Sequence, residues 1–348
     1  MKKFLIKISY TVLPLWFLLV GIVLYISLYV SPRITGDIGN LSFIPFGHEY
    51  VDFLSKKTLK DTLFQTVDST KALQSIRVDV LTIGDSFSQQ KNIGYQNYLC
   101  TKGLSVANCA RNLYFSPIQY AYDLLVSDII DSTNTQVLVV ENVERDFQNA
   151  ANNFNISKKE LLQENPSKIK KKTSKINMDK PKNEWSLLRA RDFLFYRMGK
   201  NNPIYTAQLD KEYFTSNEPT KLYFYHDDID SDVKIDKTNE SKIRQTFEAL
   251  TTKANEKGIE LILMIAVDKY DLYQNHIMNN TMPKKTINED LHKIFGENPN
   301  ILLTKFYLLP LIENGEKDVF MYNDTHWSYK ASKMVANELY QRIADGIH

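Results

Sequence analysis

The stretch Val78-Asp79-Val80-Leu81-Thr82-Ile83-Gly84-Asp85-Ser86-Phe87-Ser88 decides the fold. Its first half is mostly β-branched or apolar, as in a buried strand, and Gly84 and Asp85 then begin a turn. A helix is expected to follow, reaching Lys102. A strand that runs directly into a helix is the repeating unit of open α/β sheets. The hydroxyl of Ser86 would then lie at the carboxyl edge of the sheet, where such folds bind their ligands.

Strand and helix alternate again farther along the chain. The near-continuous apolar run Gln136–Val140 is typical of a strand buried on both faces. Further strands are expected at 104–109, 259–266 and 301–306, and helices at 51–67, 116–130, 241–256, 287–295 and after Ser328, whose side chain would cap the last helix. This order predicts an α/β fold in which a parallel sheet is flanked by helices on both faces.

The N-terminus carries a membrane-length apolar segment. Tyr10–Val30 contains no charged residue, and as a helix it would span about 30 Å, the thickness of a hydrocarbon core. Lys2, Lys3 and Lys7 precede it, so the positive-inside rule places the N-terminus in the cytoplasm and the rest of the chain outside. A cleaved signal peptide is the alternative, but the apolar run is longer than a signal core and no small-residue cleavage site follows.

Three regions are therefore expected. They are a single-pass transmembrane anchor at 1–32, a juxtamembrane region at 33–75 and one extracytoplasmic domain at 76–348, with an insertion at about 146–237 that breaks the strand–helix rhythm. Within the insertion, Lys158–Lys182 holds nine lysines against three acidic residues. This run is either a solvated surface segment or a surface for an anionic polysaccharide or lipid headgroups.

Composition excludes several classes of protein. The chain has 348 residues, 43% hydrophobic and 24% charged, which supplies a large core and excludes a mainly disordered chain. A net charge of +2 gives no field that would attract nucleic acid. Six scattered histidines and two cysteines show no metal-ligand spacing, so neither a metal nor a cofactor is expected. Outside the cytoplasm Cys100 and Cys109 could form a disulfide, or remain two buried thiols.

A serine, a histidine and an aspartate form the candidate catalytic group. The Ser86 hydroxyl would stand beside the backbone N–H groups at a helix start, which favour an oxyanion. A serine hydroxyl needs a base at neutral pH. In Asp324-Thr325-His326-Trp327-Ser328, His326 can take the Ser86 proton and Asp324 can orient the imidazole. We therefore predict Ser86 as nucleophile, His326 as acid and base, and Asp324 as its partner.

These motifs resemble those of the SGNH (GDSL) hydrolase superfamily. The resemblance rests on Gly84-Asp85-Ser86 at the end of a first strand and on the Asp-x-His element near the C-terminus. The forms of both motifs are closer to the SGNH-like O-acetyltransferases of alginate and exopolysaccharide biosynthesis. Val137–Arg145 and Ile265–Tyr273 are similar to two further segments of that branch. The fold that this implies is an SGNH-like α/β domain.

The resemblance also departs from that branch in two ways. In the alginate enzymes the Asp-x-His element precedes the serine element, whereas here it follows, as in ordinary SGNH hydrolases and in the anchored protein that helps to D-alanylate teichoic acids. The resemblance implies an oxyanion or substrate-binding role for Asn108, after the second strand, and for Asn142, after the third. Asn142 lacks the Gly-x-Asn-Asp form of the family block.

Three more side chains are expected near the substrate by the same resemblance. Arg145 would bind an acyl or sugar oxygen, or would instead be a buried ion-pair partner of Glu141 or Glu144. Lys269 and Tyr273 follow a strand on the presumed active edge and would contact substrate there.

The expected function is transfer of an acyl group, namely acetyl, onto a cell-surface or secreted polysaccharide. An acyl-Ser86 ester would form first, and a sugar hydroxyl would then attack it. The resemblance implies a membrane-bound O-acyltransferase partner that carries acetyl across the membrane. A carbohydrate esterase or lipase with the same triad, and a non-catalytic assembly or binding protein with the same fold, remain alternatives.

Overall fold

A parallel sheet forms the centre of the molecule. The computed structural model describes residues 2–42, 44–47, 49, 56–157, 198 and 203–346. Its main sheet has six strands in the order β1-β3-β2-β4-β7-β8, and every neighbouring pair is parallel. The strands are β1 (Gln65–Val67), β2 (Val80–Ile83), β3 (Val106–Cys109), β4 (Val137–Val143), β7 (Glu260–Ala266) and β8 (Ile301–Leu303).

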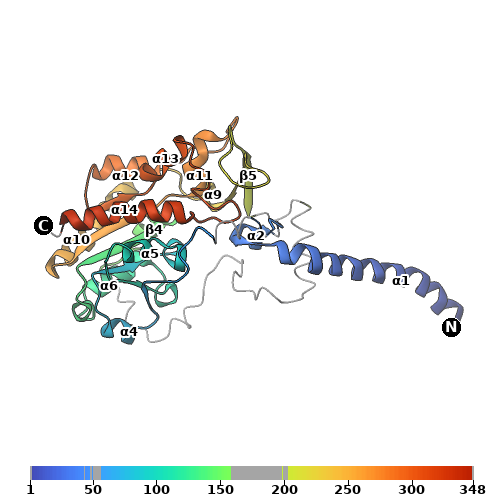
Figure 1. Ribbon diagram of the computed structural model, residues 1–348, viewed down its shortest axis with the longest axis horizontal. Helices are drawn as coiled ribbons and strands as arrows, with labels where there is room; N and C mark the ends of the chain where they lie inside the picture. The colour runs from blue at the N-terminus through green and yellow to red at the C-terminus, as the bar shows by residue number, and fades with distance from the viewer. Residues whose placement is uncertain are drawn as a thin grey trace.

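Helices cover both faces of this sheet (Figure 1). Alternate residues of β7 belong to two separate apolar cores, with Ile262 and Met264 in one and Leu261 and Leu263 in the other. The helices that pack on the first core are α5 (Tyr95–Cys100), α13 (Lys305–Glu313) and α14 (Tyr329–Gly346). The helices that pack on the second core, on the other face of the sheet, are α4 (Thr70–Ser75), α6 (Pro117–Leu125), α7 (Glu144–Asn152), α10 (Lys237–Glu256) and α12 (Ile287–Phe295). The predicted α/β class and its parallel sheet are confirmed.

Several element predictions were accurate where the apolar pattern is long. Helix α12 has the predicted bounds 287–295. Ser328 precedes α14 and its Oγ accepts a hydrogen bond from the Lys330 N–H at 3.2 Å, so it caps that helix as expected. Val335 and Leu339 face the core from α14.

Three predicted helices are wrong in part. The described end of the segment 51–67 is not helical, and its last residues form β1, because Val67 is buried and pairs in register with Cys109 of β3. Residues 50–55 lie outside the described part of the chain. The helix expected to reach Lys102 is interrupted, since Lys91 adopts a positive φ of 51° and Gly94 is extended, so short 3₁₀ turns precede α5. The helix predicted over 116–130 stops early, and α6 ends at Leu125.

The predicted insertion contributes a small hairpin where it is described. Strands β5 (Ile204–Gln208) and β6 (Lys221–Tyr225) pair antiparallel and form a separate sheet. The lysine run 158–182 lies outside the described residues.

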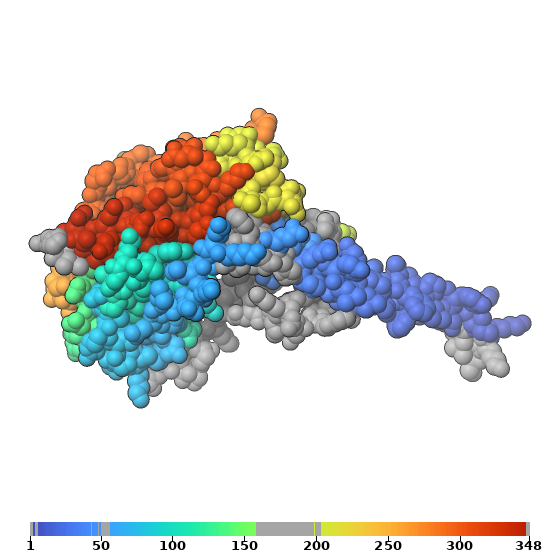
Figure 2. Space-filling view, in the orientation of Figure 1, coloured from blue at the N-terminus to red at the C-terminus, as the bar shows by residue number. Residues whose placement is uncertain are grey.

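The N-terminal helix stands apart from the globular part (Figures 1 and 2). Helix α1 (Lys2–Tyr25) continues through a π-helical turn and a 3₁₀ turn. The membrane-length segment runs from Ile6 to Arg33, and its most apolar 18-residue window has a mean hydropathy of 2.3. Only 6% of its most apolar window is buried. By length and composition this segment can cross a membrane. Helix α2 (Gly36–Ser42) follows immediately and packs near β5 and β6.

Candidate active site

Ser86 begins a 3₁₀ turn (Ser86–Gln89) directly after β2, and its side chain is exposed. Asp85 fixes this turn from both sides. Its Oδ1 accepts the Phe87 N–H at 3.1 Å, and its Oδ2 accepts the Val143 N–H at 2.6 Å at the end of β4. Asp85 therefore has a structural part in the turn, while the Ser86 hydroxyl makes no hydrogen bond to any other residue that the structure describes. A free, exposed hydroxyl at this edge is accessible to a substrate.

The turn can lie this close to β4 only because residue 84 is glycine. A Cβ on Gly84 would stand 2.1 Å from the Ser88 Oγ and 2.4 Å from the Glu141 Oε2. Those two groups are themselves hydrogen-bonded at 2.9 Å, and Glu141 is fully buried. Asn108 supports the turn from β3, because its Nδ2 donates to the Ser88 carbonyl oxygen at 2.9 Å. The structure thus places Asn108 beneath the turn, 1% exposed.

His326 and Asp324 lie in the loop between α13 and α14. The His326 Nδ1 is 2.6 Å from the Asp324 Oδ1, which also accepts the His326 backbone N–H at 3.1 Å. The other ring nitrogen, Nε2, is buried and has no hydrogen-bond partner among the described residues. A carboxylate on Nδ1 orients the imidazole and leaves Nε2 available to accept a proton.

The serine turn and the histidine loop pack against each other. The Phe87 ring centroid lies 4.9 Å from that of His326 and 4.6 Å from that of Trp327. The Gln90 Nε2 donates to the Trp327 carbonyl oxygen at 2.9 Å, across 237 sequence positions. Trp327 is 0% exposed, so it packs rather than presenting a face to a sugar. Ser86 and His326 are not hydrogen-bonded to each other; in free enzymes such contacts are often long and shorten when substrate binds.

The electrostatics of the pair favour an imidazolium beside a carboxylate. Burial opposes the charged form of His326, but the Asp324 carboxylate outweighs it and raises the pKa of His326 to about 9. Burial likewise works to raise the pKa of Asp324, but the charge of His326 and its hydrogen bonds lower that pKa to about 2. Asp324 is therefore ionised over the physiological range and can stabilise the protonated ring.

Lys269 holds the same loop from its buried side. It is the first residue of α11 (Lys269–Tyr273), and its Nζ donates to three backbone carbonyl oxygens, those of Met321 at 2.7 Å, Tyr322 at 3.1 Å and Asp324 at 3.0 Å. The side chain is 1% exposed. Burial lowers the pKa of Lys269 to about 7. In this structure its contacts are with the loop backbone.

The other residues predicted to bind substrate are also buried or largely buried. Arg145 pairs with Asp228 at 3.2 Å and with Asp268, so the predicted partners Glu141 and Glu144 are wrong. The reason is that α7 turns its second residue toward the end of β7, where these two aspartates are buried. Asn142 donates to the neighbouring Val143 carbonyl oxygen at 2.9 Å, and Tyr273 is fully buried. Cys100 and Cys109 are free thiols.

One residue at the site carries no sequence signal. Asp37, from α2, lies beside the histidine loop, where its Oδ1 accepts the Thr325 N–H at 2.6 Å and its Oδ2 is 3.4 Å from the His326 Nδ1. Burial first, and then the charge of Asp324, raises the pKa of Asp37 to about 7. The contact joins positions 288 apart, and Gly36-Asp37 belongs to no motif that would have pointed to it.

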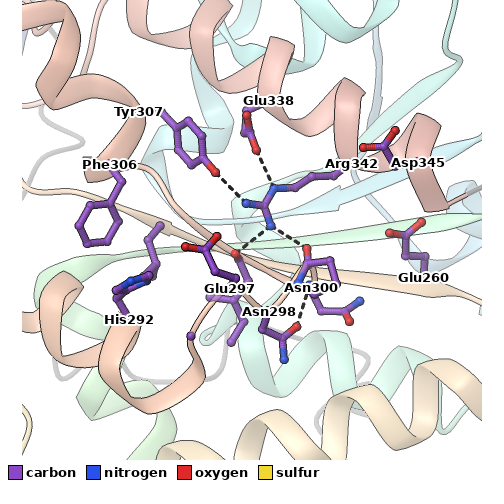
Figure 3. A pocket seen from close by; sticks show the side chains of 14 residues that line it. Glu260, His292, Glu297, Asn298, Asn300, Phe306, Tyr307, Glu338, Arg342 and Asp345 are labelled. Atoms are coloured by element: carbon purple, nitrogen blue, oxygen red, sulfur yellow. Dashed lines mark hydrogen bonds and ion pairs between the residues drawn. The ribbon is translucent and has the colours of Figure 1, made fainter.

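A cavity of about 730 Å³ lies at the opposite, amino-terminal edge of the sheet, near the starts of β7 and β8 (Figure 3). Arg342 crosses it, with its donors already used by the Pro299 and Ile301 carbonyl oxygens, the Tyr307 hydroxyl and Glu338. None of the predicted site residues lines this cavity. Ser86 and His326 lie at the other edge, where the Phe87 ring packs against the His326 ring.

A family comparison matches the C-terminal part of the chain. Residues 221–347 match a family described as the SGNH hydrolase-like domain of acetyltransferase AlgX. This part of the chain is therefore similar to an SGNH hydrolase-like domain. The matched residues include β7, β8, α14 and the loop with Asp324 and His326. The predicted resemblance to the SGNH-like O-acetyltransferase branch is confirmed, although Ser86 and the strands before it precede the matched residues. No curated protein and no solved structure matches the chain.

Proposed function

We propose that the protein is an O-acetyltransferase that acts on a polysaccharide outside the cytoplasm through Ser86, His326 and Asp324. The observation that carries this proposal is that the turn with the exposed Ser86 packs, through Phe87, against the His326 ring, which Asp324 orients. His326 and Asp324 belong to residues that match an acetyltransferase SGNH hydrolase-like domain. An acyl-transfer enzyme needs a nucleophile, a base and an orienting acid at one place, and these residues supply all three.

The reaction has two balanced halves. In the first, Nε2 of His326 takes the Ser86 proton while Oγ bonds to the acyl carbon, and the donor's leaving group departs with that proton. In the second, a sugar hydroxyl gives its proton to Nε2 of His326 as its oxygen bonds to the acyl carbon, the bond from that carbon to the Ser86 Oγ breaks, and His326 returns the proton to Oγ. Asp324 stabilises the imidazolium in both halves. The backbone N–H of Ser86 would bind the oxyanion, because the N–H groups of Phe87 and Ser88 already donate to Asp85.

The location and the partner belong to the same proposal. Lysines before the membrane-length helix favour an N-terminus in the cytoplasm and a domain outside it. Outside the cell an acetyl donor must be delivered through the membrane. By its resemblance to the polysaccharide-acetylating branch, the protein would receive acetyl from a membrane-bound O-acyltransferase.

Esterase activity is the second candidate, and the exposure of Ser86 favours it. Water can reach an acyl group held at an exposed turn, and water would then replace the sugar hydroxyl in the second half of the reaction. Hydrolysis and transfer share the first half, so one assay can test both.

The test uses the full chain in detergent micelles and a chromogenic acetyl ester. Ser86→Ala should abolish turnover, because it removes the proposed nucleophile. The melting temperature should stay unchanged, because the hydroxyl makes no hydrogen bond within the described structure. Ser75→Ala, on the exposed end of α4, is the matched control and should keep full activity. Adding oligosaccharide acceptors should divert acetyl from water to sugar. Retained turnover in Ser86→Ala would refute the proposal, and acetate release that no acceptor diverts would leave an esterase.

A further inference from the structure

The residues that follow the membrane-length helix dock on the catalytic loop. Thr35, Gly36 and Asp37, which we term the juxtamembrane clasp, contact the loop at three consecutive positions. The Thr35 Oγ1 accepts a hydrogen bond from the Asn323 Nδ2 at 2.8 Å. The Asp37 backbone N–H donates to the Asp324 Oδ2 at 3.1 Å. The Asp37 carboxylate accepts both the backbone N–H of Thr325, at 2.6 Å, and its hydroxyl.

The fit of the clasp depends on a glycine. Gly36 has a φ of +71°, which side chains rarely adopt. A Cβ at this position would lie 2.0 Å from the Asn323 backbone oxygen. The backbones of Gly36 and Asn323 therefore lie so close together that no side chain fits at position 36.

The clasp completes the hydrogen bonds of the catalytic aspartate. Asp324 uses Oδ1 for the His326 imidazole and Oδ2 for the Asp37 N–H, so both of its oxygens are fixed. The Asp37 carboxylate, in turn, is held by Thr325 and lies 3.4 Å from the His326 Nδ1. A second carboxylate this close adds negative charge beside the ring that must carry the proton.

We propose that Asp37 is a positioning residue of the active site, and that the juxtamembrane clasp makes the catalytic loop depend on the segment that leaves the membrane. This inference rests on the proposed function, because it assigns Asp37 a role in orienting the His326 ring and in stabilising its protonated form. The membrane-length helix ends at Arg33, so the chain between it and Asp37 reaches roughly 14 Å at most. The active site is thus tied close to the membrane end of the domain.

The test compares variants of the full chain in detergent micelles. Asp37→Ala removes the acceptor and the charge, Asp37→Asn keeps an acceptor and removes the charge, and Asp68→Asn, an exposed aspartate on the same juxtamembrane region, is the matched control. On a chromogenic acetyl ester at pH 9.5, where Asp37 is ionised and the His326 ring is mostly neutral in every variant, we expect kcat to fall roughly a hundredfold in Asp37→Ala and roughly tenfold in Asp37→Asn, with KM within about twofold of the parent. The control should match the parent.

A second readout separates positioning from mere support of the fold. The pKa of His326, followed by NMR of the ring in each variant, should fall by roughly half a unit to one unit when the Asp37 charge is removed. A residue that only stabilised the fold would lower the melting temperature without moving this pKa. Activity within twofold of the parent in Asp37→Ala, or an unchanged His326 pKa in both variants, would overturn the proposal.

The two proposals fail in different ways. If Ser86→Ala keeps its activity, the proposed function is wrong, while the NMR titration still decides whether Asp37 acts on His326. If Ser86→Ala is inactive and Asp37→Ala is fully active, the triad stands and the clasp is refuted. Gly36→Ala provides an independent check, because the displaced clasp should reproduce the kcat loss of Asp37→Ala without altering any polar side chain.

Discussion

His326 holds its proton more tightly than an ordinary histidine because a carboxylate stands at Nδ1. A general base must be neutral to accept the Ser86 proton. With a pKa raised to about 9, the ring is mostly protonated at pH 7. We therefore predict that kcat/KM for an acetyl ester rises with pH until about 9 and then levels off, as a pH–rate profile would measure. A plateau already reached at pH 7 would contradict the charge arrangement described for this pair.

The same shift links the pH dependence of stability to that of activity. A histidine whose pKa is higher in the folded than in the unfolded state contributes stability that is fully present below pH 6.5 and is lost as pH rises through about 9. The free energy of unfolding should therefore fall over the range in which activity rises. Replacing His326 with Gln should flatten this fall in a series of denaturant titrations across that range.

At the scale of elements, Lys269 links α11 to the catalytic loop through three carbonyl oxygens. Lys269→Met removes all three donors and leaves buried acceptors, which we expect to cost about 3 kcal/mol of unfolding free energy. It should also lower kcat and leave KM unchanged, since the side chain contacts the loop and not an open surface. Denaturant unfolding and steady-state kinetics measure these effects. Lys317→Met, which breaks a surface pair with Glu212, is the control and should change little.

An outcome in which Lys269→Met raised KM and spared stability would instead support direct contact with substrate, the role that family resemblance implies for this lysine. The structure gives the side chain no exposed surface for that contact, so the two roles predict different kinetics.

Long apolar runs made most elements predictable, and short ones did not. Strand β4 and helix α12 were evident because their side chains repeat with a clear period or are buried on both faces. Strand β1 spans only Gln65–Val67, and its conformation comes from pairing with β3 rather than from its own residues. A three-residue strand fixed by a distant partner carries too little local signal to be recognised.

The candidate site was predictable to the same extent. Ser86, Asp324 and His326 lie in short motifs whose chemistry can be recognised, and the structure packs those motifs together. Asp37 could not be found in this way, because its contacts are distant in sequence and its neighbours form no motif. The partners of Arg145 were misjudged for a related reason, since Asp228 and Asp268 reach it through tertiary packing alone.

For the whole molecule, the membrane-length helix and its flanking lysines predict a single orientation. In spheroplasts of a bacterial host, protease added from outside should remove a tag placed after His348 and spare a tag placed before Met1. Intact mass should retain Met1–Arg33, which a cleaved signal peptide would lose. Protection of the C-terminal tag would place the domain on the wrong side of the membrane for the proposed function.

With this orientation, the juxtamembrane clasp would hold the loop that contains His326 close to the outer face of the membrane. A catalytic loop tied within a few residues of the end of the helix works close to the membrane, where a membrane-delivered acetyl donor would arrive. Under the proposed function, the membrane-length helix and the clasp would hold the serine site where acyl transfer takes place, close to the membrane surface.

The most direct test of the central claim is to trap the acyl-enzyme. The full chain is mixed with an acetyl ester, quenched in acid and analysed by intact mass and peptide mapping. We predict one hydroxylamine-labile acetyl group on the peptide that contains Ser86, absent from Ser86→Ala, strongly reduced in His326→Ala and discharged by an oligosaccharide acceptor. Ester turnover with no acetyl on Ser86, or with the acetyl on another residue, would contradict the account.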